Sequence, residues 1–266
     1  MALVSIEHHE FSLIARAASL NVQTLGHGKP VLLLHSGAGP GSMMPLASAL
    51  EARSHVILPT MPGFDDQPRQ AGIVTIGDVA TLYLSLLEQM RATDVTIIGN
   101  SVGGWIAAEM ALRKSPRVSG IVLLDAIGLD PSPEGGAVLD PLKLGPAVGA
   151  YAFHDPQRFG TPPDEAAAER IRRNQQVLLT YAGEPFMNDP TLRRRLPKMP
   201  VPSLVIWGES DRIVTPAYGY QFAQLMPNAR FKLVPQAGHF PQIEATAVVV
   251  ESIAEFVGSV ISMRQS

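Results

Sequence analysis

The chain has 266 residues, of which 46% are hydrophobic and 17% charged, and its formal net charge at pH 7 is −3. This composition fits one large α/β domain with an insertion, and it excludes the basic field that would attract nucleic acid or an anionic membrane. Because the chain has no cysteine, a disulfide framework and a thiolate metal site are also excluded.

The first ten residues, Met1–Glu10, contain no cationic segment followed by an apolar run, so we expect no signal peptide. The longest apolar stretches have the length of a strand, far below the roughly 20 residues that cross a bilayer. We therefore expect a cytoplasmic protein that acts on a small molecule and binds neither nucleic acid nor a membrane. A homodimer is compatible with this sequence.

Strand patterns and helix patterns alternate along the first half of the chain. The strands are expected at Phe11–Ala17, Leu20–Leu25, Val31–Leu34, His55–Pro59, Val95–Ile98 and Val118–Leu124, with helices at Ser42–Arg53 and from Thr75 to Met90. Thr75 and Asp78 have the spacing of a capping box, with Asp in place of Glu. This alternation predicts an α/β fold with a mostly parallel, doubly wound sheet.

A serine stands at the turn between the strand Val95–Ile98 and the helical pattern that follows. Gly99 and Gly103, two residues before and two after Ser101, leave room for a sharp turn that presents the hydroxyl at the carboxyl end of the strand. This pattern resembles the nucleophile elbow of the α/β-hydrolase superfamily. The resemblance implies an α/β-hydrolase fold with Ser101 as its nucleophile.

The alternation of strands and helices is interrupted at about residue 128, where prolines become frequent. Members of the resembled family insert a cap at this point. The resemblance therefore implies a short helical cap over residues 128–200, between a first core part at 1–127 and a second at 201–266. A helix is expected at Glu165–Tyr181 in the cap. The second core part is expected to contain strands at Ser203–Gly208 and Arg230–Val234, a helix that starts at Thr215-Pro216, and a closing helix at about Ala245–Ser262.

Ser101, Asp211 and His239 each fall on a loop after a strand, at the edge of the sheet where open α/β folds bind their ligands. A serine nucleophile needs a base to accept its proton and a carboxylate to orient that base. The order Ser, Asp, His is that of the resembled family, which implies these three residues as nucleophile, acid and base. Asp125, at the end of an earlier strand, is the alternative acid.

A glycine-rich loop that begins at His35 follows the first buried strand. The corresponding loop of the resembled family donates a backbone N–H to an oxyanion, which implies Gly37 as a donor, with Ala38 as the neighbouring alternative. The N–H of Val102 would be the second donor. Ser36 stands where the family usually has glycine, and we expect His35 to order the loop rather than to take part in the chemistry.

Two local features resemble the hydrolases that cleave C–C bonds in meta-cleavage products of aromatic degradation. They are the loop that begins at His35 and Asn100, which directly precedes the serine. In that subgroup a cap arginine reads the substrate carboxylate. Arg172 or Arg173 would correspond to it here, with Arg172 taken as the candidate, and a solvated surface arginine is the alternative. Phe240 replaces the tryptophan that usually follows the histidine. The candidate substrate-binding residues are therefore Ser36, Ala38, Asn100, Arg172 and Phe240.

The predicted function is a serine-dependent hydrolase that acts on a small-molecule carbonyl, either a carboxylic ester or the C–C bond of a vinylogous diketone. Dehalogenases and epoxide hydrolases of this fold are excluded, because they need an aspartate at the position of Ser101. A non-hydrolytic lyase or a ligand-binding protein of the same fold is the alternative. We find no ligand cluster for haem, flavin or zinc, so we expect no cofactor and no metal.

Overall fold

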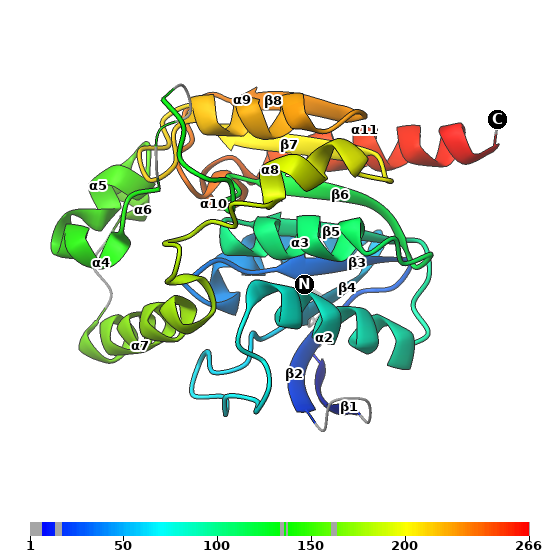
Figure 1. The fold of residues 1–266 in the computed structure, drawn as a ribbon, viewed down its shortest axis with the longest axis horizontal. Coiled ribbons are helices and arrows are strands. Elements are labelled where there is room, and N and C mark those ends of the chain that lie inside the picture. The colour runs from blue at the N-terminus through cyan, green and yellow to red at the C-terminus, as the bar shows by residue number, and fades with distance from the viewer. Residues whose placement is uncertain (1–6, 14–17, 134–135, 137, 161–163, 266) are drawn as a thin grey trace.

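The part of the chain that the structure describes, residues 7–13, 18–133, 136, 138–160 and 164–265, is built on an eight-stranded sheet with the order β1-β2-β4-β3-β5-β6-β7-β8. The structure is a computed structural model, shown in Figure 1. The strands are β1 (Glu7–Leu13), β2 (Ala18–Leu25), β3 (Lys29–Leu34), β4 (Ser54–Pro59), β5 (Val95–Asn100), β6 (Val118–Leu124), β7 (Ser203–Gly208) and β8 (Ala229–Val234). Three predicted segments lie partly outside the described residues: the first six residues of Met1–Glu10, residues 14–17 of the predicted strand Phe11–Ala17, and residues 134–135 within the insertion.

The central strands are buried along their whole length. Every residue of β5, β6 and β7 is buried, which matches their nearly continuous apolar sequence and their position between two helical layers. Strands β3 to β8 pair in parallel, whereas β1 and β2 add an antiparallel edge through the β2–β4 pairing. The predicted strands Val118–Leu124 and Ser203–Gly208 are confirmed residue for residue.

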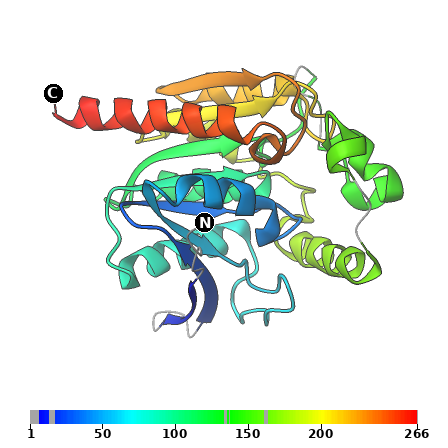
Figure 2. The same cartoon turned by 180° about the vertical axis from the view of Figure 1, so that it is seen from behind.

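Helices cover both faces of the sheet. One face carries α2 (Ile76–Gln89), α3 (Val102–Leu112) and α9 (Pro216–Leu225), and the opposite face carries α1 (Met44–Leu50) and α11 (Thr246–Gln265), as Figures 1 and 2 show from the two sides. Each face has its own cluster of buried apolar side chains. This arrangement confirms the predicted doubly wound α/β-hydrolase fold.

A group of helices lies between β6 and β7 in the sequence. Most of it extends beyond the carboxyl ends of the strands, and its last part lies over the face of the sheet that carries α3 (Figure 1). The group consists of α4 (Pro141–Leu144), η2 (Gly145–Ala147), α5 (Val148–Ala152), α6 (Pro156–Phe159), α7 (Glu165–Ala182), α8 (Leu192–Arg195) and η3 (Leu196–Lys198). Buried Glu109 of α3 accepts hydrogen bonds from Arg113 and from Arg195 of α8, which ties the end of this group to the core. The predicted cap is therefore present, while its exact boundaries at 128 and 200 stay a prediction.

One predicted helix is divided in the structure, and a separate turn that was not predicted precedes another. The expected helix Ser42–Arg53 is a 3₁₀ turn, η1 (Pro40–Met43), followed by α1; Pro45 lies in the first turn of α1, where its missing N–H costs nothing. The expected closing helix is preceded by a separate turn, α10 (Pro241–Glu244), because Ala245 leaves the helical conformation with φ −133° and ψ 44°. Sequence periodicity does not reveal such local breaks.

The longest described helix, α11, has 20 residues. Neither it nor any other helix within the described ranges is both long and apolar enough to cross a membrane.

We predict that Thr75→Ala destabilises the protein. Thr75 Oγ1 accepts the Asp78 N–H and Asp78 Oδ2 accepts the Thr75 N–H, each at 3.1 Å, which confirms the capping box at the start of α2. Loss of the cap should lower the free energy of unfolding by about 1 kcal/mol, measured by urea denaturation. Thr75→Ser keeps the hydroxyl and is the control; an equal loss in both variants would contradict a capping role.

Candidate active site

Ser101 occupies the turn between β5 and α3 in a strained backbone conformation, with φ 57° and ψ −117°. The turn is so tight that side chains are excluded on both sides of it. A Cβ on Gly99 would lie 2.1 Å from the carbonyl oxygen of Gly103, and a Cβ on Gly103 would lie 2.1 Å from that of Leu34. Since each obstacle is main chain, only glycine fits at these two positions, and the predicted elbow is present in the structure.

Asp211 and His239 form a buried hydrogen-bonded pair. Nδ1 of His239 lies 2.8 Å from Oδ2 of Asp211, and the two residues are 5% and 3% exposed. Oδ1 of Asp211 accepts the N–H groups of Ile213 and Val214 at 2.8 and 3.0 Å, which stabilise the ionised carboxylate. Because an ionised carboxylate only accepts, Nδ1 of His239 carries the proton and Nε2 is left as the basic nitrogen.

The loop that carries Asp211 is held by Trp207 at the end of β7. This indole is completely buried, and its Nε1–H donates to the carbonyl oxygen of Val214 at 2.9 Å. The backbone N–H of Asp211 also donates to the carbonyl of Gly208. These bonds fix the turn between the strand and the carboxylate, so the pair does not depend on side-chain packing alone.

Asn100 connects the serine elbow to the histidine loop. Its Nδ2 donates to the carbonyl oxygens of Leu124 and His239, both at 3.1 Å, and the residue is fully buried. Its two amide hydrogens are therefore used by the protein's own backbone. Asn100, predicted as a substrate-binding residue, thus holds the His239 loop against the end of β5, next to Ser101.

The glycine-rich loop after β3 contains the two backbone N–H groups, of Gly37 and Ala38, that the sequence offered as alternative oxyanion donors. Oγ of Ser36 accepts the N–H of Ala38 at 3.1 Å, so Ala38 is already paired. Among the residues that the structure describes, the N–H groups of Gly37 and of Val102, at the start of α3, have no hydrogen-bond partner. Of the two alternatives that the sequence left open, Gly37 is thus the one with an available donor. Ser36 itself is 2% exposed and shapes the loop from inside.

His35 joins the same loop to the segment after β4. Its Nδ1 lies 2.7 Å from the carbonyl oxygen of Ser36, and its Nε2 accepts the N–H of Met61 at 3.0 Å. Burial lowers the pKa of His35 from 6.5 to about 4, against the smaller opposing effect of the Ser36 hydrogen bond. His35 is therefore neutral at pH 7 and has both ring nitrogens occupied, as expected for a residue that orders the loop.

Helix α7 lies directly over the glycine-rich loop. Nε2 of Gln175 is 2.7 Å from the position that a Cβ on Gly37 would take, and Asn174 exchanges two hydrogen bonds with Asp65, at 2.8 and 2.9 Å. Neither Gln175 nor Asn174 is among the predicted site residues. Buried Asn174, Leu178 and Tyr181 follow the spacing i, i+4, i+7, so this helical period was the signal that could have identified the inner face.

The arginines of α7 are paired with acidic groups near the surface. Arg170 contacts Asp65, Arg172 contacts Glu169 at 2.7 Å, and Arg173 contacts Asp66. The Arg172 side chain is 56% exposed. The structure therefore does not bring Arg172, the predicted reader of a substrate carboxylate, to the Asp211–His239 pair.

Phe240 packs edge-on against the ring of His239, with the centroids 5.2 Å apart, and also contacts Phe153 of the cap. The cap touches both loops of the pair through main-chain bonds as well. The N–H of His239 donates to Ala152 at 2.7 Å, and the N–H of Arg212 donates to Tyr151 at 3.2 Å. Phe240 is therefore at least a packing partner of the histidine.

A second carboxyl group lies beside the Asp211–His239 pair. Three atoms lie within 4.8 Å of one another: a carboxylate oxygen of Asp125, a carboxylate oxygen of Asp211 and a ring nitrogen of His239. They are close enough to hold a cation. However, Nδ1 of His239 and Oδ2 of Asp211 are already bonded to each other. We therefore interpret the cluster as a hydrogen-bonded network rather than as a metal site.

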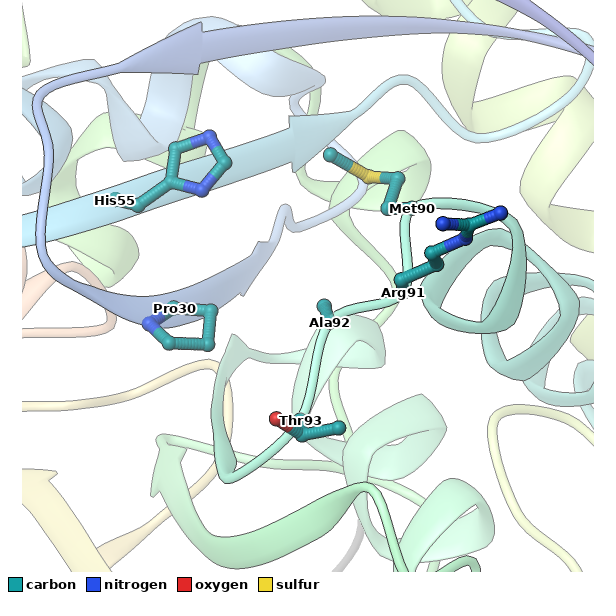
Figure 3. Close-up of a pocket in the computed structure, with 6 residues that line it drawn as sticks. All are labelled: Pro30, His55, Met90, Arg91, Ala92 and Thr93. Atoms are coloured by element: carbon teal, nitrogen blue, oxygen red, sulfur yellow. The ribbon is translucent and has the colours of Figure 1, made fainter.

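A hollow of about 280 Å³ lies elsewhere on the molecule, at the amino ends of β3 and β4 and the carboxyl end of α2 (Figure 3). It is lined by Pro30, His55 and residues 90–93. Since ligands of open α/β sheets bind at the carboxyl ends of the strands, this hollow is on the opposite edge from the candidate site.

Comparisons with known proteins agree with the fold. A family model described as "Alpha/beta hydrolase family" matches residues 31–252. The 2-hydroxymuconate semialdehyde hydrolase of Pseudomonas putida is 28% identical over 251 residues, which cover 87% of this chain and 88% of that protein. Lipase 3 of a Moraxella species is 26% identical over 233 residues, 82% of this chain and 74% of the lipase. The solved structure of a 2-hydroxy-6-oxo-6-phenylhexa-2,4-dienoate hydrolase from a Rhodococcus species superposes with a TM-score of 0.77 at 22% identity, covering 95% of this chain and 99% of that one.

We predict that His35 makes the protein less stable as the pH falls from 6.5 to about 4. In that range the unfolded chain binds a proton at this residue and the folded chain does not, so the free energy of unfolding should fall by about 3 kcal/mol from His35 alone. Urea denaturation at a series of pH values measures this. His35→Gln should show a shallower decline, and parallel curves for the two proteins would contradict the prediction.

Proposed function

The chain belongs to the alpha/beta hydrolase family and is a hydrolase, and from that premise we propose that it cleaves carboxylic esters of small molecules through Ser101, His239 and Asp211. One observation carries the proposal: a buried Asp211–His239 pair, bonded at 2.8 Å, is tied through Asn100 to the elbow on which Ser101 stands. A hydroxyl, a correctly oriented base and a carboxylate are the groups that acyl transfer requires.

The proposed reaction begins with proton transfer from Ser101 to Nε2 of His239. The serine oxygen attacks the ester carbonyl, and the protonated imidazole then gives its proton to the departing alcohol. Water, deprotonated by the same nitrogen, releases the acid from Ser101. Asp211 stays ionised and stabilises the imidazolium, which fits the two backbone N–H groups that its other oxygen accepts.

The developing oxyanion would be bound by the N–H groups of Gly37 and Val102. Both are unpaired within the described residues. Val102 is also the first residue of α3, where the positive end of the helix dipole favours a negative charge. A donor of this kind is worth about 3 kcal/mol of transition-state stabilisation. Ser36 and His35 would contribute by keeping the loop in the conformation that leaves the Gly37 N–H free.

Ester hydrolysis is preferred over C–C bond cleavage because of the surroundings of the triad. A dienoic acid brings a carboxylate that needs a cationic partner, but Arg170, Arg172 and Arg173 are each paired with an acidic residue. C–C cleavage remains the second candidate on account of the 28% identity with the 2-hydroxymuconate semialdehyde hydrolase.

We predict that the purified protein turns over a short aryl ester faster than a vinylogous diketone acid of the meta-cleavage type. Both reactions are followed by absorbance, with Ser101→Ala as the blank. A fluorophosphonate should label the wild type and not Ser101→Ala, as detected by mass spectrometry. Faster turnover of the diketone would favour C–C hydrolysis. Failure of the folded wild type to label would contradict the proposed nucleophile and favour a lyase or a binding protein.

We predict that Asp211→Asn lowers kcat by about 10⁴-fold, because the amide would favour the wrong tautomer of His239. Steady-state kinetics with the aryl ester measures this effect. Asp164→Asn is the matched control, since Asp164 is exposed at the start of α7 and asparagine caps a helix equally well. Unchanged turnover of Asp211→Asn would mean that another group is the acid.

A further inference from the structure

Asp125 is a buried carboxyl group for which the proposed reaction has no role. It follows β6, is 0% exposed, and lies within 4.8 Å of the ligand atoms of Asp211 and His239. Its Oδ1 accepts the N–H of Gly208 at 2.8 Å. Its Oδ2 is buried and, within the described part of the chain, has no group that donates a hydrogen bond to it.

The hydrogen bonds identify which of the two carboxyls is ionised. Asp211 receives three donors, the N–H groups of Ile213 and Val214 on Oδ1 and Nδ1 of His239 on Oδ2. Asp125 receives one. Two carboxylates this close and this deeply buried cannot both be charged, so the proton belongs to the group with fewer donors.

We propose that Asp125 is a neutral carboxylic acid whose O–H donates to Asp211, and that it thereby acts as a positioning residue for the Asp211–His239 pair. The proposal rests on the function proposed above. A carboxylate has about four acceptor positions, and Asp211 uses three of them; the open one is on Oδ2. A proton on Oδ2 of Asp125 fills that position and at the same time gives the otherwise unpaired oxygen a partner.

The electrostatic surroundings of Asp125 agree with this assignment. Burial, and then the charge of Asp211, raise the pKa of Asp125 well above its ordinary value, while the Gly208 N–H has a smaller, opposite effect. The titratable groups that face Asp125 are Asp211 after β7, His239 after β8 and Glu244 of α10, whose negative charge acts in the same direction as that of Asp211.

The charge of Asp125 determines how its replacement changes the acid limb of the pH–rate profile. A neutral Asp125 that donates to Asp211 withdraws negative charge from the partner of His239. Loss of the donor would therefore make His239 more basic and move the limb to higher pH. An ionised Asp125 would instead stabilise protonated His239 directly, and its removal would move the limb to lower pH.

The kinetic test compares Asp125→Asn with Asp125→Ala on the aryl ester. Asparagine keeps both the donor toward Asp211 and the acceptor for Gly208, so kcat/KM should stay within about threefold and the acid limb should not move. Alanine removes the donor, so kcat/KM should fall about tenfold or more and the limb should move to higher pH. A shift of the limb to lower pH in Asp125→Asn, or an unmoved limb in a folded Asp125→Ala, would overturn the proposal.

Infrared spectroscopy tests the protonation state without any substrate. At pH 7 the wild type should show the carbonyl stretch of a protonated carboxylic acid, which Asp125→Asn should lack and the control Asp164→Asn should keep. Absence of that band in the wild type would overturn the proposal even if the ester is hydrolysed. Its presence in a protein with no esterase activity would support the protonated Asp125 and contradict the proposed function alone.

Discussion

The close approach of α3 to β3 is the constraint on which the rest of the site depends. A Cβ on Gly103 would collide with the carbonyl of Leu34, and one on Gly99 would collide with the carbonyl of Gly103. Main-chain atoms therefore occupy the space on both sides of the turn, and no side chain fits there. This contact turns the chain sharply enough to lift Ser101 out of the sheet. It also places the start of α3 beside the loop that carries Gly37, and there the Val102 N–H has no partner among the residues that the structure describes.

Around that turn the site is organised mainly by bonds to main-chain atoms. Asn100 holds the carbonyl of His239, His35 holds Ser36 and Met61, and Trp207 holds Val214. Breaking one of these bonds would leave a buried polar group unpaired, which costs about 1–3 kcal/mol. Each of these residues therefore fixes the position of a neighbouring loop more strictly than an apolar side chain of the same size would.

The sequence predicted those features that depend on local patterns. The buried strands β6 and β7, the elbow glycines and the capping box of α2 each have a signature within a few residues, and all are present. The pairing of Asp211 with His239 was also predictable, because parallel strands bring their carboxyl ends to one edge of the sheet.

What the sequence left unresolved depends on tertiary contacts. The partners of the polar side chains of α7 are supplied by Asp65 and Asp66, more than 100 residues away: Asp65 pairs with Asn174 and Asp66 with Arg173, while Arg172 is left at the surface. Likewise, the choice between Ala38 and Gly37 as oxyanion donor depends on the Ser36 side chain, whose hydroxyl oxygen accepts the Ala38 N–H. No spacing rule in the sequence contains that information.

The cap is attached to the core in two different ways. At the α5 end, the carbonyl oxygens of Ala152 and Tyr151 accept the main-chain N–H groups of His239 and Arg212. Helix α7 is instead joined through the side chains of residues 170, 173 and 174. Backbone bonds persist when a side chain is replaced, so the exposed side chains of α5 can diverge without displacing the histidine. Substitutions in α7 instead alter the wall above Gly37. Under the proposed function, α7 is therefore the element in which substitutions would change the substrate range while the proposed triad keeps its geometry.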